Sequence, residues 1–93
     1  MTEETKAKRT VKITNPQGLH VRPADMFVKR AVQFESKIDV IKDNERVDGK
    51  SILAILMLAA EAGTVLQLEA TGPDAELALD SLVELVSQNF HEA

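Results

Sequence analysis

The sequence predicts an α+β domain in which three helices cover one face of a largely antiparallel four-stranded sheet. Four segments alternate polar and apolar residues, as strands with one buried face do. Three other segments repeat apolar residues at helical spacing. The two kinds of segment follow one another in the order βαββαβα, which is typical of a two-layer, open-faced sandwich.

The 93 residues are enough for one domain. Residues 1–8 are polar and are expected to form a flexible N-terminus, residues 9–90 the domain, and residues 91–93 a C-terminal tail. The first strand is expected in "RTVKIT", with Val11 and Ile13 on its buried face. The first helix is expected from Val21 to Phe34, with Pro23 in its first turn, where the missing N–H has no cost.

The second half of the chain continues the pattern. "KIDVIK" reads as the second strand, and "RVDG" as a weak third strand that belongs at an edge of the sheet. The second helix is expected to begin after Ser51, a good N-cap, and to end at Gly63. "TVLQLEAT" reads as the fourth strand. The last helix is expected to carry Asp74 and Glu76 in its first turn and an apolar stripe that ends at Phe90.

Composition excludes several classes of function. No cysteine is present, so disulfides, thiol chemistry and cysteine zinc sites are excluded, and His20 and His91 lie too far apart in sequence for a metal-ligand motif. The net charge of −4 argues against nucleic-acid binding. The longest apolar run is too short to span a bilayer, and the N-terminus does not resemble a signal peptide. We therefore expect a cytoplasmic protein without membrane insertion, metal or cofactor.

The stretch "NPQGLHVRPAD" places His20 at the start of the first helix and Arg22 two residues later. The first N–H groups of a helix have no intrahelical partner and favour an anion, and a guanidinium matches phosphate oxygens. A neutral imidazole is a nucleophile near neutral pH, so this site can carry a phosphoryl group on His20. The simpler interpretation is a helix cap or a surface histidine.

The motif "GLHVRPA" resembles the active-site signature of the HPr family, the histidine-containing phosphocarriers of the bacterial phosphotransferase system; only Val21 departs from the usual alanine. "KSILAILMLAA" and "LEATGPDAELAL" are similar to the family's second helix and to its last strand and helix. The resemblance covers residues 9–90. It implies a sheet in the order 1-4-2-3 and a carrier rather than an enzyme. His20 would accept a phosphoryl group on Nδ1 from phosphorylated enzyme I, stabilised by Arg22, and pass it to an IIA protein or domain.

The second helix carries more large apolar residues than one buried face needs, which indicates a partner-binding surface. The resemblance implies that Ile52, Leu53 and Leu56 form this surface, with Lys29 at its rim, while Ile55 and Leu58 face the core. Ser51 matches the serine that a kinase phosphorylates in many members. A plain N-cap role for Ser51 needs no kinase, and Ala54 replaces the usual glycine in that motif.

Three further functions remain open at this point. The chain resembles in part the nitrogen-related branch of the family, whose carriers serve regulatory partners. Some relatives act in carbon catabolite control by binding regulatory proteins. A hydrolase using His20 as a base is also conceivable, but it lacks a second catalytic group. A monomer is expected.

Overall fold

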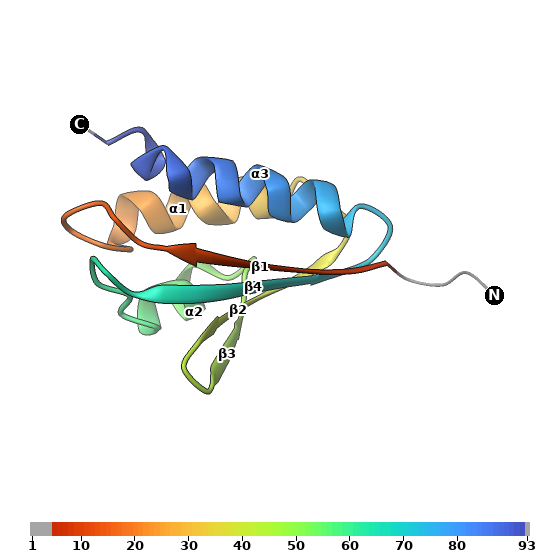
Figure 1. Cartoon of the computed structure of the whole chain (residues 1–93), viewed down its shortest axis with the longest axis horizontal. Coiled ribbons are helices and arrows are strands. Elements are labelled where there is room, and N and C mark those ends of the chain that lie inside the picture. Colours follow the sequence, from red (N-terminus) through yellow and green to blue (C-terminus); the bar gives the residue numbers. More distant parts are fainter. Residues whose placement is uncertain (1–4, 93) are drawn as a thin grey trace.

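The computed structural model describes residues 5–92 and contains the predicted elements in the predicted order. These are β1 (Lys6–Lys12), α1 (Val21–Ala31), β2 (Lys37–Lys42), β3 (Glu45–Asp48), α2 (Ile52–Met57), β4 (Val65–Thr71) and α3 (Ala75–Ser87), followed by a short turn, η1 (Asn89–His91). The strands pair antiparallel in the order β1-β4-β2-β3, which confirms the expected α+β fold and places β3 at an edge. Figure 1 shows α1 and α3 side by side over the sheet.

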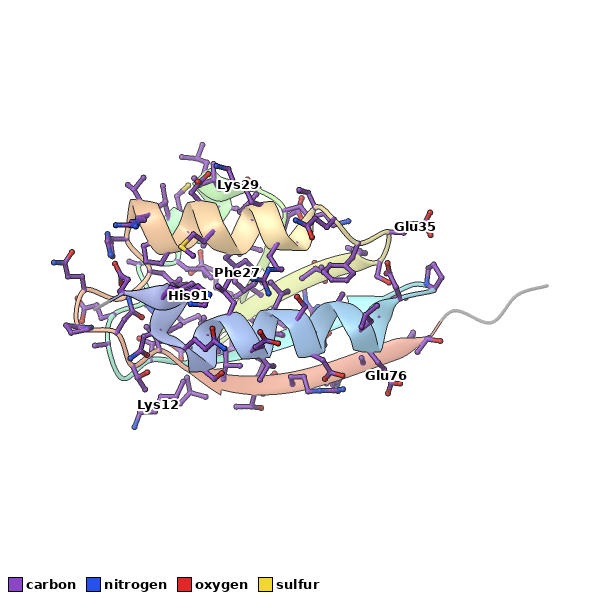
Figure 2. The ribbon with its side chains drawn as sticks, turned by 90° about the horizontal axis from the view of Figure 1, so that it is seen from above. Lys12, Phe27, Lys29, Glu35, Glu76 and His91 are labelled. Carbon is purple, nitrogen blue, oxygen red and sulfur yellow. The ribbon has the colours of Figure 1, made fainter. Side chains whose placement is uncertain are left out.

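The core lies between the sheet and the helices. Alternation in the strands turns Ile38 and Val40 of β2, and Leu66 and Leu68 of β4, toward the helices, and all four are buried. Phe27 of α1 reaches into the space between α1 and α3 (Figure 2). Burial of each such side chain contributes about 2 kcal/mol. The short helix α2 packs against α1 and β3 and adds Ile55 to the same core.

The opposite face of the sheet is polar, as expected for an open-faced sandwich. Arg46 donates to Asp39 and to Glu69, each over 2.9 Å, across three neighbouring strands. The hydrogen bond from Arg46 lowers the pKa of Glu69. Because the Arg46 side chain is half exposed, solvent screens both pairs and they add little to stability. No helix within residues 5–92 combines the length and apolar character needed to cross a membrane.

β1 begins earlier than the alternation indicates. Lys6, Ala7 and Lys8 already pair with β4, and Ala7 is buried. The strand therefore starts three residues before residue 9, inside the segment expected to be flexible. Part of that segment, residues 1–4, lies outside the described residues.

The predicted end of α2 at Gly63 is wrong, because the helix stops at Met57. Tertiary hydrogen bonds take the carbonyl groups that would continue it. The Lys42 ammonium donates to the Leu58 carbonyl over 2.9 Å, and the Leu19 N–H donates to the Ala60 carbonyl over 2.8 Å. Ala59, between these two residues, adopts a left-handed φ of 52°. The helix therefore ends inside the apolar run and well before Gly63.

The last helix also ends earlier than predicted. α3 stops at Ser87, and Asn89, Phe90 and His91 have left-handed φ values of 52°, 55° and 58°. This conformation costs roughly 1–2 kcal/mol per residue. Burial of Phe90 and a hydrogen bond from the Thr14 hydroxyl to the Asn89 side chain offset the cost. Phe90 is buried as predicted, but in the turn and not on the helix.

Asp74 precedes α3 and was expected in its first turn. The residue occupies the N-cap position, yet its carboxylate makes no capping bond to α3. It accepts hydrogen bonds instead from the Ser36 hydroxyl (2.6 Å) and from the N–H groups of Ser36 and Glu35 (2.9 and 3.0 Å). These bonds, the hydroxyl first, lower the pKa of Asp74 and join the start of α3 to the turn that enters β2.

Candidate functional site

The loop before α1 is held in one conformation by Gly18. This glycine has a φ of 66°, and its N–H donates to the Asn15 carbonyl over 3.0 Å. A Cβ at this position would lie 2.4 Å from the Ala60 carbonyl oxygen. The loop therefore packs directly on the backbone that follows α2, and only glycine fits there.

His20 is the N-cap residue of α1. Its backbone is extended (φ −76°, ψ −172°), its carbonyl accepts the first helical bond from Ala24 over 3.0 Å, and its side chain makes no capping bond. Pro23 supplies no N–H, so the amides of Val21 and Arg22 remain at the open end of the helix. Neither donates to another of the described residues, and the first turn contains no acidic side chain. The helix start thus offers an anion two amides beside an imidazole.

The imidazole of His20 is held by a carboxylate near the other end of the described chain, that of Glu92. Nε2 of His20 lies 2.9 Å from Oε2 of Glu92, and the side chains of the two residues are 33% and 20% exposed. The other carboxylate oxygen, Oε1, accepts a hydrogen bond from Nδ2 of Asn15 over 2.8 Å. Figure 2 shows His91, which precedes Glu92, at the end of the molecule where α1 begins. The left-handed turn of η1 turns the chain in this direction.

These contacts set the proton positions of the site. An ionised carboxylate only accepts hydrogen bonds, so Nε2 of His20 is the donor. In a neutral ring the lone pair then lies on Nδ1. Nδ1 has no hydrogen-bond partner between residues 5 and 92. The amide of Asn15 is oriented in the same way, because both of its neighbours, the Glu92 carboxylate and the Gly18 carbonyl, can only accept. Its Nδ2 therefore donates to both, the second over 2.7 Å, and its buried Oδ1 lacks a partner among the described residues.

Glu92 was missed by the sequence interpretation, which assigned it to a tail. No local pattern marks it, because its contact to His20 joins residues 72 positions apart. Only the left-handed path of Asn89–His91 brings the two together, and left-handed residues of this type have no strong sequence signal apart from the asparagine.

The two basic residues predicted near the site face the solvent. Arg22 is exposed, and its guanidinium makes no ion pair or hydrogen bond within the described part of the chain. Lys29 lies on α1 two helical turns after Arg22, and its ammonium pairs with Asp25 over 3.0 Å. A pair of this i,i+4 type on a helix surface is weak, so Lys29 can exchange partners readily.

The exposed apolar residues of α2 are partly those predicted. Leu53 is 67% exposed and Ile52 is 36% exposed, whereas Leu56 is half-buried against the core. Ile55 and Leu58 are buried as expected. Met57, at 71%, is the most exposed member and was not singled out, although it lies one turn after Leu53.

Ser51 is the N-cap residue of α2. Its Oγ accepts a hydrogen bond from the Ala54 N–H over 3.2 Å, as the capping interpretation predicts. The side chain is partly exposed. Among residues 5–92, no three His, Cys, Asp or Glu side chains gather in a geometry that could hold a metal ion.

The chain as a whole resembles known proteins. Residues 7–88 match the family model described as the PTS HPr component phosphorylation site. The phosphocarrier protein HPr of Neisseria meningitidis is 42% identical over 85 residues, which cover 91% of this chain and 96% of that protein. The phosphocarrier protein NPr of Shewanella violacea is 36% identical over 96% of this chain and 98% of its own length.

Solved structures agree with the sequence comparison. The crystal structure of HPr-C-His from Thermoanaerobacter tengcongensis superposes with a TM-score of 0.91 at 44% identity, covering 94% of this chain and 98% of that one. HPr from Bacillus anthracis superposes with a TM-score of 0.83 at 36% identity, covering 87% and 96%. The chain belongs to the HPr family and is a phosphoryl carrier of the phosphotransferase system.

Proposed function

We propose that His20 is the residue that carries the phosphoryl group, and that Nδ1 is the acceptor atom. The contact between Nε2 and Glu92 is the observation that supports this choice, because it leaves the lone pair of a neutral ring on Nδ1. His20 is the N-cap residue of α1, and the amides of Val21 and Arg22 follow it directly in the chain. A phosphoryl group on Nδ1 gains from the helix dipole and from amides that have no other partner.

Arg22 serves as the mobile cation of the site. Its guanidinium is exposed and free of partners among the described residues, so it can turn toward an incoming phosphoryl group without breaking an existing ion pair. A guanidinium offers two parallel N–H donors to phosphate oxygens, which fits a group that arrives and leaves repeatedly.

The donor in this proposal is enzyme I, which is phosphorylated by phosphoenolpyruvate, and the acceptor is an IIA protein or domain. The chain is a cytoplasmic monomer that acts as a carrier with a transient phosphohistidine and not as an enzyme with turnover of its own. Partners dock on Ile52, Leu53 and Leu56, with Lys29 at the rim of this surface. The exposure of Leu53 and the weak pairing of Lys29 support that assignment.

Ser51 is the candidate for regulation. A phosphate on its hydroxyl would gain from the N-terminus of α2, where the Ala54 N–H already donates to Ser51, and would place negative charge next to Ile52 and Leu53. Phosphorylation of Ser51 would therefore weaken docking. Incubation with a kinase specific for HPr serine, followed by peptide mass mapping of wild type and Ser51→Ala, tests this assignment.

The test of the carrier site uses both histidines. The protein is incubated with phosphoenolpyruvate and enzyme I, and its intact mass is measured before and after acid treatment, since a phosphoramidate is labile to acid and stable to alkali. His20→Ala should lose the added phosphoryl group, and His91→Ala, which changes an exposed histidine outside this contact, should retain it. Labelling that persists in His20→Ala would refute the assignment.

A further inference from the structure

The side chain of Glu92 contacts that of His20 over 2.9 Å, yet the carrier motif does not include Glu92. Its carboxylate is four-fifths buried and binds two residues at once, Oε2 facing Nε2 of His20 and Oε1 accepting from Asn15. Asn15 is in turn fully buried and donates to the Gly18 carbonyl. The carboxylate is therefore held by the loop that precedes α1, on the side of the ring opposite to Nδ1.

We propose that Glu92 is a positioning residue for phosphoryl transfer, which selects the reactive tautomer of His20 and stabilises the charge that the ring acquires. This inference rests on the proposed function, since it assumes that His20 is the acceptor. It extends that proposal to a residue outside the helix-start motif, supplied by the turn that follows α3.

Two physical effects carry the assignment. With Nε2 donating to Glu92, the neutral ring holds its lone pair on Nδ1, so the acceptor nitrogen is chosen before a donor arrives. During transfer that lone pair forms the Nδ1–P bond, while the bond from phosphorus to the donor atom breaks and its electron pair stays with the donor. The proton stays on Nε2, so the phosphorylated ring is a cation. A carboxylate 2.9 Å from Nε2 stabilises this cation, as a buried carboxylate does for other catalytic histidines.

The role of Asn15 is to hold the carboxylate rather than the ring. Its Nδ2 faces two acceptors, Oε1 of Glu92 and the Gly18 carbonyl, and its own Oδ1 is buried without a partner among the described residues. An unsatisfied buried acceptor is unfavourable. The unsatisfied Oδ1 of Asn15 therefore destabilises the fold, while Nδ2 of the same side chain holds Glu92 in contact with His20.

The first experiment needs no partner protein. Nitrogen-15 NMR of the unphosphorylated chain, at a pH where the ring is neutral, distinguishes a protonated from an unprotonated ring nitrogen. In wild type the proton should lie on Nε2. Glu92→Ala should give a mixture of the two tautomers, whereas Glu84→Gln, an exposed glutamate of α3, should leave the wild-type spectrum of His20.

The second experiment measures phosphoryl transfer from enzyme I to the same variants. A hydrogen bond to a charged group is worth enough to change a rate about tenfold. Glu92→Ala and Glu92→Gln should therefore lower the kcat of transfer from enzyme I about tenfold, with an unchanged KM of enzyme I for the variant. Gln keeps the size of the side chain but not its charge. Glu84→Gln should transfer at the wild-type rate. Thermal melts of all variants exclude loss of the fold as the cause.

The outcomes separate the two proposals. Wild-type protein that is labelled elsewhere than on His20 contradicts the proposed function, whatever Glu92 does. An unchanged tautomer in Glu92→Ala, or a changed tautomer with wild-type kcat and KM, overturns the role of Glu92 and leaves the carrier function intact.

Discussion

The backbone N–H of Leu19 donates to the carbonyl oxygen of Ala60 over 2.8 Å, joining the loop before His20 to the segment that follows α2. This bond lies directly beside Gly18, whose backbone packs on Ala60 and Glu61. This contact therefore positions the start of α1 and, together with the bond from Lys42 to the Leu58 carbonyl, ends α2. The two parts of the proposed site, the histidine and the apolar surface of α2, depend on the same junction.

Gly18→Ala should destabilise the protein by about 2–3 kcal/mol. A Cβ would lie 2.4 Å from the Ala60 carbonyl oxygen and 2.9 Å from Glu61 Cα, and the residue has a positive φ. Gly63→Ala is the matched control, because Gly63 also has a positive φ but no atom within 4 Å of its added Cβ. Only the conformational cost of about 1 kcal/mol applies there. Urea unfolding of both variants measures the difference, and equal losses would contradict the close packing at Gly18.

Arg22→Lys should slow phosphoryl transfer without changing the melting temperature. Lysine keeps the charge but loses the planar pair of donors that matches phosphate oxygens. Because Arg22 is exposed and unpaired within the described residues, its replacement removes no structural contact. Arg22→Ala should slow transfer further. Single-turnover transfer from phosphorylated enzyme I provides the rates, and wild-type rates in both variants would remove Arg22 from the site.

Leu53→Glu should weaken binding of enzyme I and IIA proteins, because it introduces a charge into a surface that must be desolvated. Leu77→Glu is the control: Leu77 on α3 is 65% exposed, against 67% for Leu53, so both changes should alter stability by about 0.5 kcal/mol or less. Transfer rates measured over a range of IIA concentrations report binding. Equal behaviour of the two variants would mean that partners do not dock on α2.

Asp74→Asn should destabilise the protein at neutral pH and much less in acid. Hydrogen bonds from Ser36 and Glu35 lower the pKa of Asp74 below its ordinary value of about 3.9. The ionised carboxylate therefore stabilises the fold above that ordinary value, and this contribution is lost as the pH falls through the lower pKa of the folded state. Urea midpoints of both proteins from neutral pH to below that range should converge, and a constant difference would contradict this origin.

The sequence predicted the elements because their patterns are local. Alternation placed Ile38 and Val40 on the buried face, and the capping preference of serine located the start of α2. Where helices end was predicted less well. The apolar run continues after Met57 without a break in the sequence. The helix α2 ends there because Lys42 and Leu19, which are remote in sequence, donate hydrogen bonds to the carbonyl groups that follow it.

The candidate site divides in the same way. His20 and Arg22 were found because a short motif at a helix start has a recognisable physical chemistry. Glu92 was not, because it reaches the ring only after a left-handed turn at Asn89–His91 that no periodicity encodes.

The turn at Asn89–His91 also has a practical consequence for work with this protein. Figure 1 shows the end of α3 and the start of α1 at one end of the molecule, and the beginning of β1 at the other. A fluorophore, purification tag or surface tether attached just beyond Glu92 would stand beside His20 and compete with incoming partners. The same attachment ahead of β1 leaves that end open, so kinetic and immobilisation experiments should use the amino-terminal side.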